Sequence, residues 1–355
     1  LASWNLGAYM TMALIGGLIA ARFGPRVVIT IGIGLTAMGM LLTGLSSGLA
    51  SASAARVLTG LGNGMVLAPS LALLASWFGA RQLGLASAVV SSGAALALVT
   101  TGPTVPLIIA WGGDDGWRWA WHAFAAVAAF MGVLAGIFLR NRPSAVAAGD
   151  PRTQASVFRG FGGIVRSRFA WHLGTVYFLY GFGFITFVTF FQRRLIGDLD
   201  FSSVAAGYLF LAMGAASLIF GLAYGVVSDR IGRGRALAAT LVLQGAAAVI
   251  LGLRPGMVAV VVAVILFGSG GFSLPGLVGA ACGEHFGRTM AAASLGFLTI
   301  FIGVGQALGP YLSGLLADGF SSFGPPYMLS ASVLFLSAII AGLLDLPRFC
   351  GSHIR

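Results

Sequence analysis

The sequence predicts an all-α, polytopic membrane protein built from two similar halves. Three observations lead to this prediction: the chain is too apolar for a soluble fold, its apolar runs recur at about the length of a membrane span, and its loop motifs repeat. Of the 355 residues, 58% are hydrophobic and 8% are charged, and the mean hydropathy is +0.97. A soluble domain carries about 25% charged residues. The composition therefore excludes a soluble enzyme, a disordered regulator and a secreted disulfide scaffold.

Eleven apolar runs are separated by Gly, Pro, Arg and Asp residues. A membrane-spanning helix needs about 20 mostly apolar residues. The predicted helices are 5–21, 27–46, 53–77, 84–110, 118–139, 169–195, 204–227, 236–253, 256–282, 290–315 and 326–346. We expect an N-terminal half-bundle over 1–139 and a C-terminal half-bundle over 169–346. A central loop over 140–168 and a tail over 347–355 complete the predicted domain organisation.

The charged residues predict how the helices are oriented. All 20 basic residues are arginines, and the formal net charge is +11. If the loop after the first helix faces the cytoplasm, fifteen arginines lie on that side and four on the outer side. Positive residues concentrate in cytoplasmic loops. We therefore expect a multi-pass protein of the cell membrane, in a bacterial inner membrane, with the central loop and the C-terminus in the cytoplasm.

The arginines also predict which partners the chain has. Because they lie between apolar runs and not on a soluble surface, we expect no nucleic-acid partner. The central loop over 140–168 carries six of them. Arginines near a membrane surface attract anionic lipid headgroups, so we expect such lipids to bind this loop. The alternative is a plain linker between the two halves.

Two sequence motifs each occur twice, and the distance between the two copies is nearly the same for both motifs. Three residues of the first motif reappear 208 residues later: Gly17, Arg22 and Gly24 as Gly225, Arg230 and Gly232. Five residues of the second reappear 207 residues later: Arg81, Ala86, Ser87, Gly102 and Pro103 as Arg288, Ala293, Ser294, Gly309 and Pro310. The chain is therefore predicted to be a tandem, parallel duplication. Carried back by the same offset, the helix over 169–195 falls before Leu1, so we expect twelve spans of which the first precedes this sequence.

This organisation resembles the major facilitator superfamily of secondary transporters. The most specific motif runs Gly225-Val-Val-Ser-Asp229-Arg230-Ile-Gly232-Arg233 and is similar to the family's cytoplasmic loop motif. The resemblance implies a conformational switch, because Asp229 can accept hydrogen bonds from a helix N-terminus or pair with an arginine. The alternative is a loop that sets topology and caps a helix.

The first-half copy of this motif departs from the pattern. It keeps Gly17, Arg22 and Gly24 but has Ala21 at the position that matches Asp229. A methyl group cannot make the same charged contact. We therefore do not expect two equal latches.

Two Gly-Pro steps resemble the family's Gly/Pro helix motif. They are Gly102-Pro103 and Gly309-Pro310. Proline removes a backbone hydrogen bond and bends a helix, while glycine allows close packing. The resemblance implies that these two helices bend during gating.

Five polar residues are candidates for substrate binding or coupling: Arg56, Asn63, Tyr177, Tyr180 and Gln306. Arg56 begins a stretch similar to the family's fourth-helix motif and lies inside a predicted span, where an arginine usually faces a cavity or a partner. It would serve proton coupling or an anionic substrate, and the alternative is that it snorkels to the outer interface. The other four lie on helices that face the cavity in the family. The alternative for the aromatic run from Tyr177 to Phe191 is a lipid-facing surface.

These observations predict a secondary active transporter that moves a small solute by alternating access. The segment from Trp77 to Gly93 also looks like part of the monocarboxylate and oxalate/formate carriers, which suggests a small organic anion. A coupling proton is a further candidate partner. Two alternatives stay open: an efflux antiporter for drugs or metabolites, and a non-transporting membrane sensor or scaffold.

We do not expect an enzyme, a cofactor or a metal site. An enzyme in the membrane needs convergent His, Asp, Ser or Cys side chains within a span, and the sequence offers no such group. Neither His122 nor His172 has a metal-ligand neighbour at helical spacing.

Overall fold

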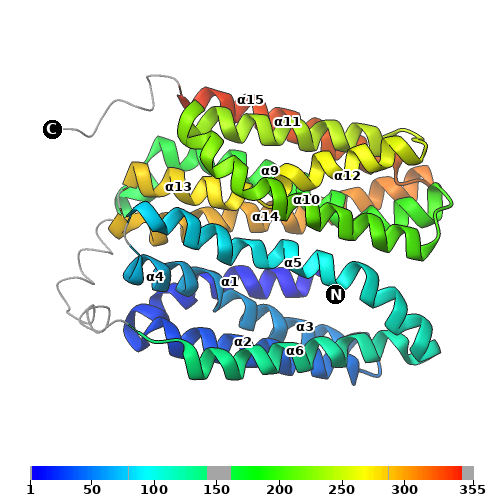
Figure 1. The fold of residues 1–355 in the computed structure, drawn as a ribbon, viewed down its shortest axis with the longest axis horizontal. Helices are drawn as coiled ribbons and strands as arrows, with labels where there is room; N and C mark the ends of the chain where they lie inside the picture. Colours follow the sequence, from blue (N-terminus) through cyan, green and yellow to red (C-terminus); the bar gives the residue numbers. More distant parts are fainter. Residues whose placement is uncertain (1, 79, 142–160, 287, 346–355) are drawn as a thin grey trace. The chain divides into compact units, whose positions relative to one another are not determined.

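The computed structural model describes residues 2–78, 80–141, 161–286 and 288–345, and these residues are almost entirely helical (Figure 1). The α-helices are α1 (Ala2–Phe23), α2 (Pro25–Gly44), α3 (Leu49–Gly64), α4 (Leu67–Trp77), α5 (Ala80–Gly112), α6 (Gly116–Phe138), α9 (Arg168–Arg193), α10 (Ser203–Ile231), α11 (Arg233–Gly252), α12 (Met257–Gly271), α13 (Leu274–Phe286), α14 (Arg288–Phe320) and α15 (Gly324–Gly342). Single turns follow α5, α9 and α15. Most of the predicted central loop (142–160) and the whole predicted tail (347–355) lie outside the described residues.

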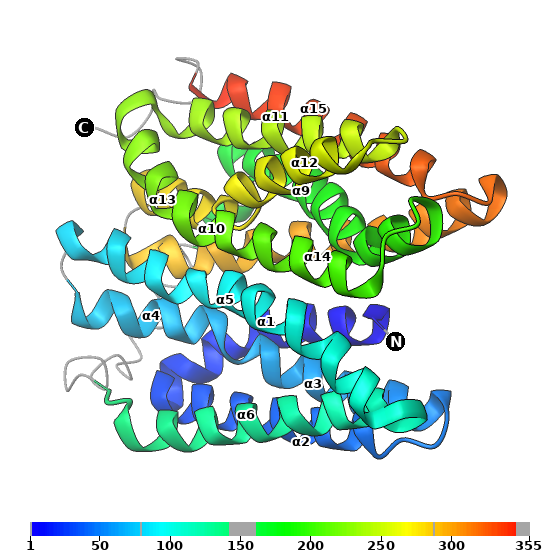
Figure 2. The ribbon, with the colours of Figure 1, turned by 45° about the vertical axis from the view of Figure 1, so that its right-hand side comes forward.

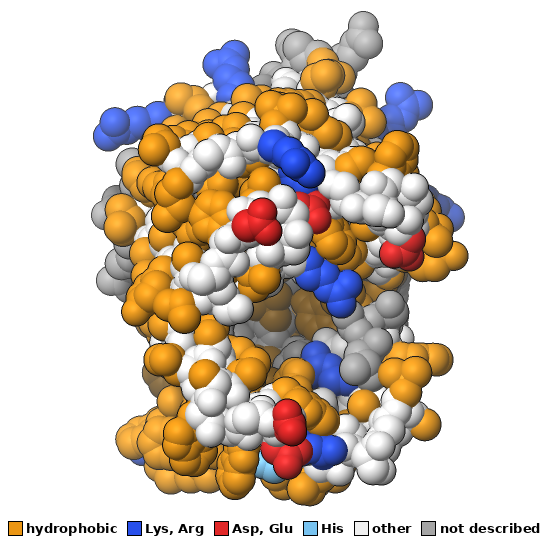
Figure 3. Space-filling model, turned by 90° about the vertical axis from the view of Figure 1, so that its right-hand side faces the viewer, with side chains coloured by type: hydrophobic (Ala, Val, Ile, Leu, Met, Phe, Trp, Pro, Cys, Tyr) orange, Lys and Arg blue, Asp and Glu red, His pale blue; other side chains and the backbone are white. Residues whose placement is uncertain are grey.

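The all-helical, multi-pass fold is confirmed. Nine of the eleven predicted helices correspond to one α-helix each. Within the described residues, eight segments are long and apolar enough to cross a membrane, and one of these, Ser92–Phe138, takes in part of α5 and the whole of α6. Large apolar side chains such as Val258 and Ile219 are exposed. Figure 3 shows the surface at one end of the helices, where arginine and acidic side chains lie among hydrophobic ones.

Two predicted helices are each broken in two, which corrects the prediction of continuous spans over 53–77 and 256–282. The first is divided into α3 and α4, and the second into α12 and α13. Pro69 and Pro275 lie in the first turn of the second segment of each pair. Proline has no N–H and clashes with the carbonyl four residues earlier, so each of these prolines removes one helical hydrogen bond at the break.

Both breaks fall at the same place in the duplicated unit. The first segments end at Gly64 and Gly271, which are 207 residues apart, and the second segments begin at Leu67 and Leu274, which are also 207 residues apart. The prolines differ by one position, since proline is the third residue of α4 and the second residue of α13. The break is therefore a feature of the repeated unit.

The two copies of the predicted switch motif supply a second structural match between the repeats. We call them the first switch loop (residues 17–26) and the second switch loop (residues 225–235). Gly24 joins α1 to α2 and Gly232 joins α10 to α11, each as a single linking residue. Their φ angles are 85° and 97°, in the left-handed region that favours glycine. Equal turns at positions 208 residues apart support the tandem duplication.

The chain divides into two compact units. Unit 1 comprises Leu1–Ala86, Leu107–Arg166 and Cys282–Gly303, and unit 2 comprises Ser87–Pro106, Ser167–Ala281 and Val304–Arg355. In unit 1, α2 packs against both α3 and α6, and α1 packs against α3. The helices α2 and α6 lie side by side in both ribbon views (Figure 2). In unit 2, α11 packs against α12 and α15, while α9 packs against α15 and α10 against α12.

Candidate functional site

The first switch loop is fastened to the end of α6. The backbone N–H of Arg26 donates to Asn141 Oδ1 over 3.0 Å, and Arg26 Nη2 donates to the carbonyl of Gly136 over 2.5 Å. A Cβ atom on Gly24 would clash with the Asn141 side chain. This loop is therefore tied to the C-terminal end of α6 by side-chain contacts as well as by its glycine turn.

In the second switch loop, Arg233 at the start of α11 donates a hydrogen bond from Nη1 to Ser228 Oγ in the last turn of α10. Arg230 is exposed. The side chains of Arg22 and Asp229 lie outside the described part of the structure, as does the burial of Gly17 and Gly225. The latch at Asp229 therefore stays a prediction.

The glycines of both Gly-Pro steps mediate close helix packing. A Cβ atom on Gly102 of α5 would lie 2.7 Å from the carbonyl oxygen of Gly207 in α10. A Cβ atom on Gly309 of α14 would lie 2.7 Å from the carbonyl oxygen of Phe182 in α9. Pro103 and Pro310 lie inside their helices, which continue past them. In unit 2 these glycines bring α5 against α10 and α14 against α9.

Arg56 on α3 packs against an aromatic ring. Its Cζ atom lies 4.7 Å from the centroid of the Trp121 ring on α6, which is a cation–π geometry. Its Nη1 atom is buried and has no hydrogen-bond partner among the described residues. Its carbonyl accepts a hydrogen bond of 3.0 Å from Asn5 Nδ2 on α1. One nitrogen of this guanidinium is thus buried and still able to donate.

Asn63 lies seven residues after Arg56, about two helical turns further along the same face of α3. Its Oδ1 accepts a hydrogen bond of 3.0 Å from Thr36 Oγ1 on α2. The intervening glycines pack closely, as expected: a Cβ atom on Gly62 would lie 2.5 Å from the backbone nitrogen of Thr36. Arg56 and Asn63 are therefore held on one tightly packed helix.

Tyr177 and Tyr180 are buried on α9, with 5% and 1% of their surfaces exposed. Their rings stack in parallel, with centroids 5.9 Å apart. Further along α9, Phe187 stacks on Phe267 of α12 at 3.6 Å and is fully buried. A lipid-facing role for this aromatic run is therefore wrong, because the run fills the interior of unit 2.

The other polar candidates of unit 2 differ in how their polar groups are used. The hydroxyl of Tyr180 donates a hydrogen bond of 2.6 Å to the carbonyl of Gly271, at the break between α12 and α13. Gln306 is half-buried on α14, between the packing glycines Gly305 and Gly309. Within the described part of the chain, the Gln306 amide makes no hydrogen bond. The structure thus brings Tyr177 and Tyr180 together in unit 2, and Arg56 and Asn63 onto one helix of unit 1.

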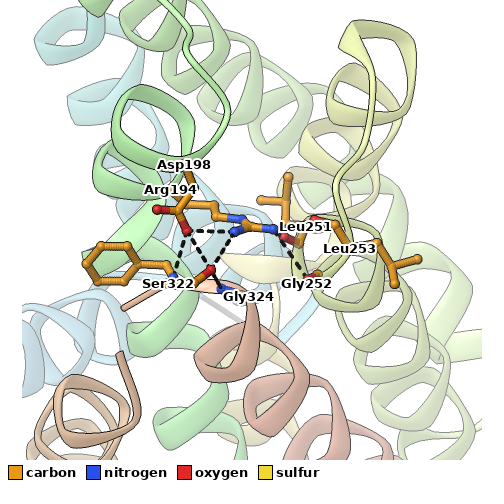
Figure 4. A network of polar contacts seen from close by, with 8 residues as sticks. Arg194, Asp198, Leu251, Gly252, Leu253, Ser322 and Gly324 are labelled. Carbon is orange, nitrogen blue, oxygen red and sulfur yellow. Dashed lines mark hydrogen bonds and ion pairs between the residues drawn. The ribbon is translucent and has the colours of Figure 1, made fainter. Parts of the chain in front are cut away.

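Arg194, whose role the sequence did not reveal, is the largest fully buried side chain among the described residues (Figure 4). It donates from Nε to the carbonyl of Leu251 over 2.9 Å and from Nη2 to the carbonyls of Gly252 and Leu253. Its Nη1 forms an ion pair of 2.6 Å with Asp198 Oδ2. We call Arg194, Asp198 and their partners the Arg194 clasp.

Asp198 completes this clasp at the start of α15. Its Oδ2 accepts hydrogen bonds of 3.0 Å from Ser322 Oγ and 2.7 Å from the backbone N–H of Phe323. The spacing of Arg194 and Asp198, four residues apart, is a signal that the sequence offered. The remaining partners lie 57 to 128 positions from Arg194 in sequence, so no local pattern could identify them.

Unit 1 has a counterpart in Arg118. Its Nη1 donates to the carbonyls of Gly44 and Ser46 over 2.9 and 2.8 Å, and its Nε lies 3.0 Å from Asp115 Oδ1. We call this group the Arg118 clasp. Gly44 and Gly252, the last residues of α2 and α11, are 208 residues apart. Each copy of the repeat therefore caps the same helix end with an arginine, although the arginines come from different elements.

Many solved structures match this fold, and two of them illustrate the similarity. The human organic anion transporter MFSD10 matches 95% of this chain and 82% of its own, with a TM-score of 0.68 and 19% identity. A variant of the Escherichia coli fucose:proton symporter FucP matches 99% of this chain and 90% of its own, with a TM-score of 0.70 and 13% identity. No curated protein matches the chain by sequence.

A family model shows the family directly. The model described as Major Facilitator Superfamily matches residues 1–294 and 194–349, which together take in nearly the whole chain. The chain belongs to the Major Facilitator Superfamily and is a secondary transporter, not an enzyme.

Proposed function

We propose that this transporter carries a small organic anion and that Arg56 binds the anion's negative charge. The observation that supports this most strongly is the buried Nη1 of Arg56, which has no partner among the described residues. A buried charge is costly unless it is paired and hydrogen-bonded. An anion that enters from water would supply both the charge and the acceptor.

The contact with Trp121 favours a carboxylate as that acceptor. The indole ring lies against the guanidinium, with 4.7 Å between the Arg56 Cζ atom and the ring centroid. Guanidinium N–H groups donate in the plane of the group, and carboxylates accept two such bonds side by side. Contact with the ring limits how the guanidinium can move, which would keep its N–H groups ready for a planar anion.

Two further properties of the proposal concern the moving parts of the protein and its orientation in the membrane. The first rests on the duplication and the second on the arginines of the loops. The half-bundles over 1–139 and 169–346 would be the bodies that move against one another around a site near the membrane midplane. The excess of arginines in alternate loops supports a cytoplasmic central loop and C-terminus. The use of arginine without lysine supports a bacterial inner membrane as the location. MFSD10, whose name describes an organic anion transporter, has the same fold, which is consistent with the proposed substrate class.

The substrate class can be tested by flux into vesicles. The product of the complete gene is reconstituted into liposomes, and initial uptake is compared for formate, oxalate and lactate against neutral sugars of similar size. We expect saturable uptake of at least one carboxylate and no uptake of the sugars. Uptake of a neutral sugar alone would contradict the proposed class. The absence of flux for all solutes, in vesicles that contain folded protein, would instead favour a non-transporting sensor.

A further inference from the structure

The break between α12 and α13 leaves one buried carbonyl without its helical partner. In a continuous helix, the carbonyl of Gly271 would accept a hydrogen bond from the N–H of residue 275. That residue is Pro275, which has no N–H. A buried carbonyl without a donor costs free energy comparable to a lost hydrogen bond.

Tyr180 supplies the missing donor from another helix. Its hydroxyl lies 2.6 Å from the Gly271 carbonyl oxygen, and the two residues are 91 positions apart. The ring of Tyr180 is 1% exposed and stacks on Tyr177, so its position on α9 is fixed. The broken conformation is therefore stabilised by a bond that α12 and α13 cannot make by themselves.

Ser273, one of the two residues of the break, has a hydroxyl that the broken form leaves unsatisfied within the described part of the chain. Its Oγ atom is buried and has no partner among the described residues. A serine inside a helix ordinarily donates to a carbonyl three or four residues earlier. Buried polar groups are nearly always satisfied, so an orphaned hydroxyl at a break calls for an explanation. The carbonyl of Gly270 already accepts from the Ser273 backbone N–H over 3.3 Å, so of the polar groups of Ser273 the broken form leaves only the hydroxyl unsatisfied by the residues that the structure describes.

We propose that Tyr180 is a positioning residue that sets the balance between the broken and a straighter form of α12–α13, and thereby governs the movement of α13 in the transport cycle. The recurrence of the break after Gly64, with Pro69 in the turn that follows, supports this, because the break belongs to the repeated unit. The proposal depends on the transporter fold and not on the identity of the substrate.

Cys282 provides a reporter for this movement. It lies on α13 and is fully buried in the broken form, so a shift away from this form can only raise its reactivity. The second cysteine, Cys350, is replaced by serine. The rate at which N-ethylmaleimide modifies Cys282 in vesicles is then measured by mass spectrometry, with no substrate present.

Tyr180→Phe keeps the ring and removes the donor. We expect the modification rate to rise by about tenfold, the factor expected for one buried hydrogen bond. Pro275→Ala restores an N–H to residue 275 and favours the straighter form, so it is expected to raise the rate as well. This second variant keeps the test decisive if Tyr180→Phe fails to fold.

Tyr327→Phe is the matched control. The hydroxyl of Tyr327 donates a hydrogen bond of 2.8 Å to the carbonyl of Phe187, and Tyr327 is fully buried like Tyr180. The carbonyl of Phe187 keeps its usual helical donor, because residue 191, four positions later, is phenylalanine and not proline. We expect similar losses of thermal stability in the two tyrosine variants but a faster reaction of Cys282 in Tyr180→Phe alone. Equal acceleration in both, an unchanged rate in Tyr180→Phe, or an unchanged or slower rate in Pro275→Ala would overturn the proposal.

Discussion

The buried Arg194 and the half-buried Asp198 form an ion pair of 2.6 Å, which joins the C-terminus of one helix to the N-terminus of another. Arg194 caps the carbonyls at the C-terminus of α11, and Asp198 accepts from the backbone N–H of Phe323 at the N-terminus of α15. A cation near a helix C-terminus and an anion near an N-terminus are each favourable. The pair therefore stabilises α9, α11 and α15 together at one end of unit 2.

Removal of the charge of Arg194 should destabilise the protein strongly. Arg194→Gln leaves Asp198 without its cation and the carbonyls of α11 with fewer donors. Loss of one partner of a buried pair costs about 3–5 kcal/mol. We expect a large fall in the midpoint of thermal unfolding in detergent. The neighbouring Arg193 is exposed, so Arg193→Gln should leave the midpoint nearly unchanged. Equal effects of the two substitutions would refute a structural role for the Arg194 clasp.

The Arg118 clasp should contribute less. The side chains of Arg118 and Asp115 are 32% and 70% exposed, against 2% and 14% for Arg194 and Asp198. Exposed ion pairs contribute about 0–1 kcal/mol. We expect Asp115→Asn to shift thermal unfolding much less than Asp198→Asn, and we expect added salt to reduce only the former effect. A larger shift for Asp115→Asn would show that the exposed fraction of each ion pair does not determine how much the two clasps contribute to stability.

Gly24→Ala should destabilise the first switch loop. The φ angle of Gly24 is 85°, and an added Cβ would meet the Asn141 side chain. We expect a loss of about 1–3 kcal/mol in the free energy of unfolding. The matched control is Gly34→Ala on α2, where a Cβ would meet no atom within 4 Å and where alanine is the better helix former. The account predicts that this control is neutral or stabilising, and a destabilisation equal to that of Gly24→Ala would contradict it.

Asp229→Asn tests the predicted latch at the second switch loop. We expect normal insertion and folding, because the change preserves size, and a shift in the balance between inward-facing and outward-facing states. Single cysteines placed at each end of the pathway and treated with an impermeant thiol reagent would report that shift. If accessibility is unchanged at both ends, the loop only sets topology and caps a helix.

The sequence was a good guide to the helices and a poor guide to their interruptions and long-range contacts. Among the described residues, nine of the eleven apolar runs bounded by Gly, Pro and Arg correspond to one α-helix each, because lipid imposes one length and one polarity on spans. The breaks after Gly64 and Gly271 were missed since each lies inside a continuous apolar run. Proline in the first turn of a helix is a common helix start, and Pro69 and Pro275 could have been interpreted in that way.

The same distinction holds for the candidate site: the sequence indicated some of its residues but not their contacts. Arg56 could be selected because an arginine inside a span is rare, but its partner Trp121 lies on another helix, 65 positions away. The bond from Tyr180 to Gly271 and the contacts of Arg194 likewise depend on tertiary packing. A tyrosine within an aromatic run gives no local sign that its hydroxyl meets a particular carbonyl. The type of a residue and its position within a span were thus enough to select candidates from the sequence. Their contact partners could be identified only from the three-dimensional fold.

The most direct test of the account is the initial rate of carboxylate uptake by Arg56→Gln vesicles, with Arg193→Gln as the control. Loss of a charge-assisted hydrogen bond to a buried ligand costs about 1.5–3 kcal/mol, so we expect the rate at low substrate concentration to fall by about tenfold or more in Arg56→Gln. Arg193→Gln should transport as the unchanged protein does. If Arg56→Gln takes up the same carboxylate at the unchanged rate, then Arg56 does not bind the substrate and the proposed anion site is wrong.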